Sequence, residues 1–356
     1  MTIKDIARES GYAVGTVSRV LNNRPDVSEQ ARRRVMEVVE KYHFRLNSNA
    51  KHLKQQVSSG IVILVKGSQN MLFVAIVERL QQQIEEKDYA CLIYYIGEQD
   101  NEVEQACQIC RERHPSGILF LGSDLELFRE RFSQIAVPCV LVTNSASELG
   151  FANLSSVSTD DEAAAVAAVD HLIALGHRRI GILGGWMEKS RAAHTRYAGC
   201  VRAFQEHDMR FTREEQYEPA LFAMSEGYRA MQRLLDRMPD LTAVFAMADV
   251  LAVGAIRAIQ DRGLRVPEDV SVVGFDGIEL GSYLTPRLAT IRQNRERIAD
   301  RSVEILLGQI EQADKAEHEL IPFEIIPGES VRTLGRAAGS GRRAEQGGGD
   351  NGEYHL

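Results

Sequence analysis

Residues 14–21, VGTVSRVL, have the types and spacing that suit contact with the edges of DNA bases. Val17, Val20 and Leu21 repeat at helical spacing, so they predict one buried face of a short helix. Arg19 lies in the same helix, and a guanidinium fork is the usual bidentate partner of guanine in the major groove. We therefore predict that Arg19 reads a base, with a plain solvated side chain as the alternative.

Two further helices are predicted to flank this segment and position it. The first begins after Thr2 and ends at Gly11, because glycine enters the left-handed conformation at little cost. The second begins after Ser28, a good helix cap, and its apolar residues again repeat at helical spacing. Three short helices with a tight turn between the first two predict a helix-turn-helix DNA-binding domain at residues 1–46.

Positive charge is concentrated in this part of the chain. Residues 1–55 contain 11 Lys and Arg against 6 Asp and Glu, a net charge of +5, whereas the whole chain of 356 residues carries −8. A basic module on an acidic protein suits binding to a phosphate-rich partner through one end. Double-stranded DNA is the partner that this distribution predicts.

After residue 58 the pattern changes to short apolar strands that alternate with amphipathic helices. Strands are predicted at 61–65, 90–96, 117–121, 137–142, 180–183, 243–246 and 270–274. Helices are predicted at 74–87, 102–113, 125–134, 161–175, 192–207, 225–237 and 250–262. This alternation is typical of parallel sheets with crossover helices, and two sets of it predict an α/β fold with two doubly wound lobes. Ligands of such folds bind at the carboxyl ends of strands or between lobes.

Several classes of protein are excluded by what the sequence lacks. No apolar run approaches the ~20 residues of a membrane helix, and the charged start MTIKDIARES has no apolar signal-peptide core, so we predict a cytoplasmic protein without membrane contact. The five cysteines are scattered, and the pair at Cys107 and Cys110 falls in a helical pattern without a second Cys/His pair. No GxSxG, P-loop, HExxH or dinucleotide-binding motif occurs. We expect no metal, no cofactor and no enzymatic activity.

Four stretches of the N-terminal part resemble the LacI/GalR family of bacterial transcription regulators. They are TIKDIARESG at 2–11, TVSRVLN at 16–22, VSEQAR at 27–32 and AKHLK at 50–54. The resemblance implies base contacts by Val14, Gly15 and Arg19. It implies phosphate contacts, which fix register without reading sequence, by Thr16, Ser18 and Asn22.

The resemblance also implies a hinge helix or linker at residues 47–58. Leu53 matches a leucine wedge that opens a base step in the minor groove, and Ala50 and Lys51 match its neighbours there. Leu46 stands where the family commonly has proline. The alternative is a plain linker with one incidental leucine.

The likeness continues, less tightly, to about residue 334. Its carriers are GHRRIGILGG at 176–185, RYAG at 196–199, SVVGFD at 271–276 and TPRLATIRQ at 285–293. It implies a periplasmic-binding-protein-like core at 59–334 that recrosses between lobes near Arg292. Lobe 1 would comprise about 59–160 and 292–320, and lobe 2 about 161–291 and 321–334. The Gly-rich, charged tail at 335–356 is predicted to be disordered.

Within that core the resemblance implies an effector site. Arg196 and Asp276 match positions that hold polar groups of the effector, and an arginine donor with an aspartate acceptor suits sugar hydroxyls. Phe73 and Trp186 would stack on the ligand or else pack ordinarily, and Asp249 would contact it or cap a helix. We predict a neutral sugar or sugar-like effector, with a sugar phosphate or nucleobase as the alternative.

Three departures from the family pattern leave the effector's identity open. Ala248 and Asp161 stand where asparagine is usual, and Thr143 stands where aspartate is usual.

The overall prediction is a ligand-responsive repressor that binds a pseudo-palindromic operator as a homodimer, since no leucine heptad follows the core to make a tetramer. The alternatives are the same fold regulated by a partner-protein corepressor, a solute-binding protein, and a sugar-processing enzyme.

Overall fold

The structure is a computed structural model, and it describes residues 3–21, 27–42, 60–67, 70–187 and 190–334. Several sequence predictions fall outside these ranges. They concern Thr2 as a helix cap, Asn22 as a phosphate contact, the hinge residues Ala50, Lys51 and Leu53, and the tail at 335–356.

Three helices form the N-terminal head, as predicted. They are α1 (Ile3–Ser10), α2 (Val14–Leu21) and α3 (Glu29–Lys41). Ser28 caps α3, because its hydroxyl oxygen accepts a hydrogen bond from the Ala31 amide at 3.3 Å. Gly11 ends α1 with a φ of +77°. Ile6, Val17 and Val35, one from each helix, are fully buried and form the core of the head.

The first lobe is a six-stranded parallel sheet. Its order is β11-β5-β4-β3-β1-β2. The strands are β1 (Ile61–Lys66), β2 (Cys91–Ile96), β3 (Gly117–Leu121), β4 (Cys139–Val142), β5 (Leu154–Thr159) and β11 (His318–Ile321). Alternate residues of β1 face opposite sides, as a strand requires. Ile61 and Ile63 pack under α5 (Met71–Glu86) and α13 (Arg295–Glu311). Val62 and Leu64 pack under α6 (Glu102–Arg113) and α7 (Leu125–Arg131), which runs into a 3-10 turn at Phe132–Gln134.

The second lobe is another six-stranded sheet, in the order β12-β10-β9-β8-β6-β7. The strands are β6 (Ile180–Gly184), β7 (Tyr217–Pro219), β8 (Ala243–Ala246), β9 (Ser271–Asp276), β10 (Ala289–Gln293) and β12 (Phe323–Ile326). All pair in parallel except β12, which is antiparallel to β10. The helices α8 (Asp161–Ala174) and α9 (Arg191–Glu206) cover one face, and α11 (Met224–Arg237) and α12 (Asp249–Asp261) cover the other. Two short elements complete the lobe, α10 (Arg213–Gln216) and a 3-10 helix at Glu279–Tyr283.

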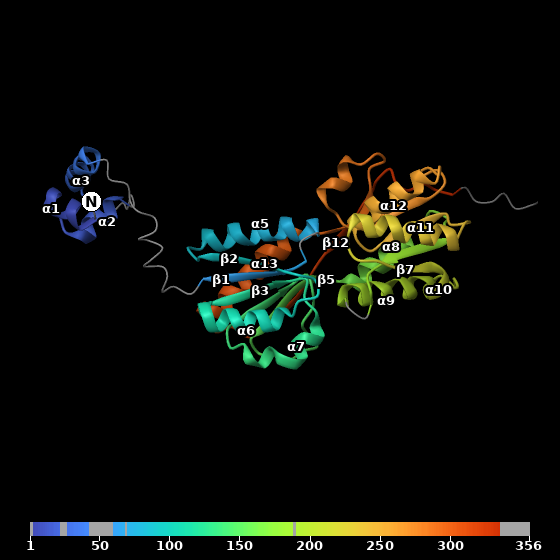
Figure 1. Cartoon of the computed structure of the whole chain (residues 1–356), viewed down its shortest axis with the longest axis horizontal. Coiled ribbons are helices and arrows are strands. Elements are labelled where there is room, and N and C mark those ends of the chain that lie inside the picture. The colour runs from blue at the N-terminus through green and yellow to red at the C-terminus, as the bar shows by residue number, and fades with distance from the viewer. Residues whose placement is uncertain (1–2, 22–26, 43–59, 68–69, 188–189, 335–356) are drawn as a thin grey trace, which may run out of the picture.

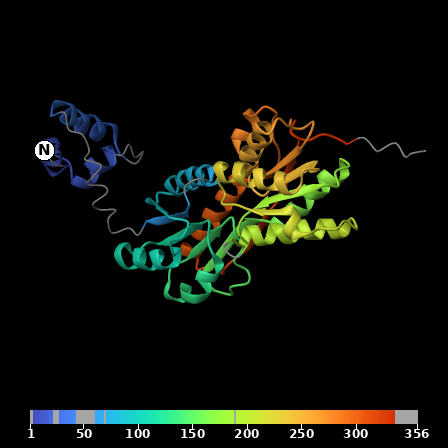
Figure 2. The same ribbon diagram turned by 45° about the vertical axis from the view of Figure 1, so that its right-hand side comes forward.

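The chain passes between the lobes three times. It leaves the first lobe between β5 and α8, returns between β10 and α13, and crosses again between β11 and β12. Figure 1 shows the result, because the late helix α13, in orange, lies beside the early helix α5 of the first lobe. Figure 2 shows from a second side that the two sheets form separate lobes joined by these crossings.

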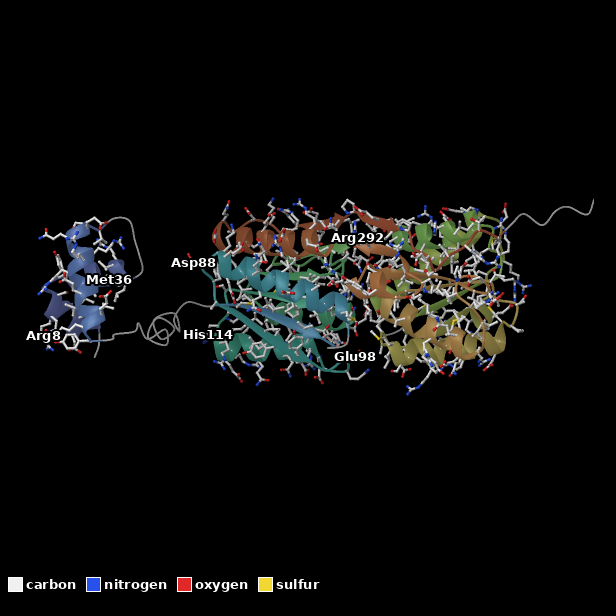
Figure 3. The ribbon with its side chains drawn as sticks, turned by 90° about the horizontal axis from the view of Figure 1, so that it is seen from above. Arg8, Met36, Asp88, Glu98, His114 and Arg292 are labelled. Carbon is white, nitrogen blue, oxygen red and sulfur yellow. The ribbon has the colours of Figure 1, made fainter. Side chains whose placement is uncertain are left out.

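Both sheets present the carboxyl ends of their parallel strands to the junction of the lobes. In Figure 3, Asp88 and His114, which precede β2 and β3, lie at the far end of the first lobe, whereas Glu98, which follows β2, lies near the second lobe. Loops that follow strands therefore meet between the lobes, where ligands of doubly wound folds bind.

Candidate functional site

Helix α2 presents its predicted base-reading residues on the surface of the head. Val14, Gly15 and Arg19 are exposed, while Val17 and Val20 are buried against α1 and α3. A side chain built at Gly15 would meet no heavy atom within 4 Å, so this face of α2 is open. An exposed helix with an apolar rear face has the form that enters a major groove.

The predicted phosphate contacts are described only in part. Thr16 is half-buried near the start of α2. The side chain of Ser18 and all of Asn22 lie outside what the structure describes. These three residues remain predictions.

A cavity of about 370 Å³ lies between the two lobes, a size that suits a small ligand. Both lobes line it. Of the predicted effector contacts, Phe73, Trp186, Arg196 and Asp276 line this cavity. The first lobe adds Lys66, Glu98, Ser123, Asp124, Thr143 and Asn144, and the second lobe adds Phe222, Ala248 and Gln293.

Arg196, on α9, is held in one position before any ligand arrives. Its side chain is buried, and Nε donates to Oδ1 of Asp161 at 2.9 Å. Nη1 donates to the carbonyl oxygen of Met247 at 2.5 Å. The guanidinium also lies over the Phe275 ring, 3.7 Å from its centre, where a cation is attracted by the π face. Because burial outweighs the attraction of Arg196, the pKa of Asp161 is raised above its ordinary value.

Asp276 ends β9 in a conformation that few side chains adopt. Its φ is +118°, and such strain is characteristic of functional sites. Its Oδ1 accepts a hydrogen bond from Nε2 of Gln293 at 2.8 Å. Burial raises the pKa of Asp276 to about 6, against the opposing attraction of Arg196, so the carboxyl group is mostly ionised at pH 7 and above.

Asp249 does not face the cavity, which corrects its assignment as an effector contact. Its side chain is fully buried behind the lining. Oδ1 accepts from the Thr290 hydroxyl at 2.6 Å, and Oδ2 accepts from the Ile278 amide at 2.8 Å. The capping alternative is also not observed, since Ala248 is the cap residue of α12 and Asp249 is its first residue. Asp249 instead secures the turn that follows Asp276.

The first lobe contributes an ion pair and several polar groups. Nζ of Lys66 lies 2.7 Å from Oε2 of Glu102, a buried residue whose Oε1 accepts from the Asp124 amide at 2.6 Å. Ser123 also lines the cavity, and its buried hydroxyl has no hydrogen-bond partner within the described chain. Thr143 adopts a φ of +77° at the same wall.

Aromatic side chains complete the cavity. Trp186, although apolar, is 47% exposed, and Phe73 and Phe222 are half-buried. A large exposed indole at a cavity favours stacking on a ligand over ordinary packing.

Sequence reasoning missed most of the first-lobe wall. Lys66 and Ser123 each stand at or just after the end of an apolar strand, as does Thr143, which the sequence analysis had named only as a departure from the family pattern. The change from apolar to polar residues at those points was the available signal. Gln293 was also missed, although it ends a strand in the same way.

Neither a metal centre nor a membrane anchor emerges from the described ranges. They contain no group of three or more His, Cys, Asp or Glu residues arranged to hold a metal ion. Within those same ranges, no helix has both the length and the apolar character to cross a membrane.

Comparison with known protein families matches both parts of the chain. Residues 2–47 match the description "Bacterial regulatory proteins, lacI family", and residues 169–331 match "Periplasmic binding protein-like domain". The HTH-type transcriptional regulator MalR of Clostridium butyricum is 33% identical over 345 residues, which span 93% of this chain and 99% of the relative.

Solved structures give the same result. The lac repressor dimer bound to operator and the anti-inducer ONPF has a TM-score of 0.76 at 25% identity, over 93% of this chain and 99% of that one. The complex of the transcriptional regulator CelR with cellobiose has a TM-score of 0.67 at 25% identity, with the same coverage.

Proposed function

Because this chain belongs to the lacI family of bacterial regulatory proteins, we propose that it is a transcriptional repressor whose hold on DNA responds to a small molecule. The head binds operator DNA, and the cavity between the lobes binds the effector. The single observation that carries this function is the exposure of Arg19 on the second helix of a helix-turn-helix.

The head reads DNA through the outward face of α2. Arg19 contacts a guanine, Val14 contacts an apolar base edge such as the thymine methyl, and Gly15 allows close approach. Thr16, Ser18 and Asn22 bind phosphate. The hinge at 47–58, with Leu53 as a minor-groove wedge beside Ala50 and Lys51, bends the duplex.

The effector is a neutral sugar or sugar-like compound. Fixed donors on Arg196, an acceptor on Asp276 and the exposed face of Trp186 suit hydroxyl groups on a ring with one apolar side. The likeness to a regulator solved with cellobiose supports this class of ligand.

A buried polar chain links the effector site to the crossings between the lobes. Gln293 donates to Asp276 and, through Oε1, accepts from the hydroxyl of Thr159 at 3.1 Å. Gln293 and Thr159 each end a strand at which the chain leaves its lobe. A ligand that contacts Asp276 therefore changes the orientation of one lobe relative to the other. The resulting coupling free energy between effector binding and DNA binding is ~1–3 kcal/mol.

The repressor is a homodimer. Exposed apolar residues gather at one corner of the first lobe, where Met71 and Val74 begin α5 and Tyr95 lies near the end of the edge strand β2. Val74 and Tyr95 are 57% and 56% exposed. A second copy covers this corner, and its head occupies the second half-site of the operator.

The protein acts by binding rather than by catalysis. It does so in the cytoplasm, where the chromosome is.

Selection of duplexes from a random pool, followed by affinity measurements, tests the DNA-binding proposal. Arg19→Ala should weaken operator binding by roughly 1–3 kcal/mol and relax preference at one base pair per half-site. Arg19→Lys is the matched control, because it keeps the charge and removes the fork. An equal loss on every sequence would assign Arg19 to phosphate alone, and failure to select any duplex would reject the proposed function.

A further inference from the structure

We propose that the cavity between the lobes excludes acidic ligands, and that Asp161 determines this specificity by neutralising Arg196. The inference rests on the proposed function, since it concerns the charge of the effector. A cavity of the opposite kind would have an unpaired arginine, which could bind a carboxylate or phosphate of the ligand.

Both cations among the described residues of the lining are already paired with buried carboxylates. Arg196 is bound to Asp161 through Nε, and the two side chains are 8% and 10% exposed. Lys66 is bound to Glu102, which is buried behind it. Each charge is therefore balanced before a ligand enters.

The other ionisable side chains in the described part of the lining are acids. Glu98, Asp124 and Asp276 all border the cavity, and Figure 3 shows Glu98 at the junction of the lobes. Asp124 caps the start of α7, because its Oδ1 accepts a hydrogen bond from the Glu126 amide at 3.1 Å. An acidic ligand would lose its hydration here, and the described lining offers it no unbalanced cation in return.

Asp161 is the residue whose charge can be removed with the least change of shape. Asparagine has the same size, and its amide oxygen can still accept from Nε of Arg196. The other bonds of Arg196, to the Met247 carbonyl and the Phe275 ring, do not involve Asp161. Asp161→Asn therefore leaves a positioned guanidinium that has lost its directly bonded carboxylate.

Asp160 supplies a matched control one residue away. Its carboxylate accepts from the Ala163 amide at 3.0 Å and so caps α8, a role that asparagine also performs. Asp160→Asn removes the same charge from the same helix end without removing the partner of Arg196.

The experiment uses the full chain at pH 7.5 and constant ionic strength. Binding is measured by thermal shift and calorimetry with glucose and glucuronate, galactose and galacturonate, ribose and ribose 5-phosphate, and inorganic phosphate. We expect no binding of the acidic members to the wild type. Asp161→Asn should gain affinity for at least one of them by roughly tenfold or more, since one unit charge changes within contact distance of the ligand. Asp160→Asn should gain little.

Two results would overturn the inference. One is an acidic member that binds the wild type as tightly as its neutral counterpart and is lost in Arg196→Ala. The other is an Asp161→Asn variant that gains no more than Asp160→Asn. Both leave the proposed function standing, which fails instead if operator is not bound.

Discussion

Asp276, at the cavity, is in an energetically unfavourable state in three respects. Its backbone is strained, its carboxyl group is buried, and its surroundings raise the pKa of that group and so disfavour its ionisation. Asp249 secures the turn behind it, and Gln293 secures the side chain. Strain and unfavourable burial at one position are expected where a carboxylate is preorganised to bind a ligand.

The raised pKa of Asp276 predicts a pH-dependent difference in stability. Its pKa in the folded protein, about 6, exceeds the unfolded value near 3.8, so its stabilising contribution is present below pH 3.8 and is lost as pH rises through 6. Asparagine does not titrate. The melting temperature of Asp276→Asn relative to wild type should therefore be highest at pH 8 and decrease toward pH 5.

Glu130→Gln provides the control for this measurement, because Glu130 is an exposed carboxylate on α7. Its difference from wild type gives the baseline against which the pH dependence of Asp276→Asn is judged. A constant difference for Asp276→Asn would show that Asp276 has an ordinary pKa.

Gly15 makes a second prediction at this scale. A methyl group there meets open space, and glycine inside a helix is less stable than alanine by about 0.5–1 kcal/mol. Gly15→Ala should stabilise the head by that amount, as measured by amide exchange in the full chain. If instead the head is destabilised, α2 is crowded at this point. Loss of operator affinity in the same variant would support close approach of Gly15 to DNA.

At the scale of elements, the short helices of the head depend on one another for stability. Helix α2 has eight residues, too few to be stable alone. It is held by Val17 and Val20 against α1 and α3. Helices α1 and α3 are therefore the support on which the DNA-reading surface depends.

Removal of the cap of α3 should weaken that support. Ser28→Ala deletes the acceptor for the Ala31 amide and should cost about 1 kcal/mol. Faster amide exchange in α3 and weaker operator binding should follow. Ser28→Asn restores an acceptor and should behave as the wild type. Equal exchange rates in all three proteins would show that the cap contributes nothing.

At the scale of the molecule, the two edges of the first sheet differ in purpose. The order of the sheet places β2 at one edge and β11 at the other. Both expose an apolar side chain, and at the β2 edge Met71 and Val74, at the start of α5, are exposed as well as Tyr95. An edge strand with exposed apolar residues needs a cover, and in the proposed dimer a second copy supplies it.

A charge at this corner should separate the two copies. Val74→Glu should shift the protein toward monomer in analytical ultracentrifugation and weaken operator binding, because two heads no longer bind together. The control is Leu320→Glu at the opposite edge, where Leu320 is 56% exposed on β11. A dimer that survives Val74→Glu with unchanged operator affinity would place the interface elsewhere.

The sequence by itself determined the local elements and the DNA-binding head. The helix at 102–113 was predicted to the residue, and the three helices of the head were also predicted correctly. These features depend on periodicity and caps within about a dozen residues. The short or polar strands escaped prediction, among them β5, whose LSSVST is buried through its pairing rather than through apolar character.

Only the tertiary structure decided which residues form the cavity. Lys66, Ser123 and Asp276 are far apart in sequence and meet because parallel strands end at one edge and the chain crosses between lobes three times. The same packing gave different places to Asp276 and Asp249, which the sequence analysis had both offered as effector contacts, with a helix cap as the alternative for Asp249. One carboxylate borders the cavity and the other is enclosed by Thr290 and Ile278. Burial depends on the neighbours that the whole fold supplies, and no local pattern carries that information.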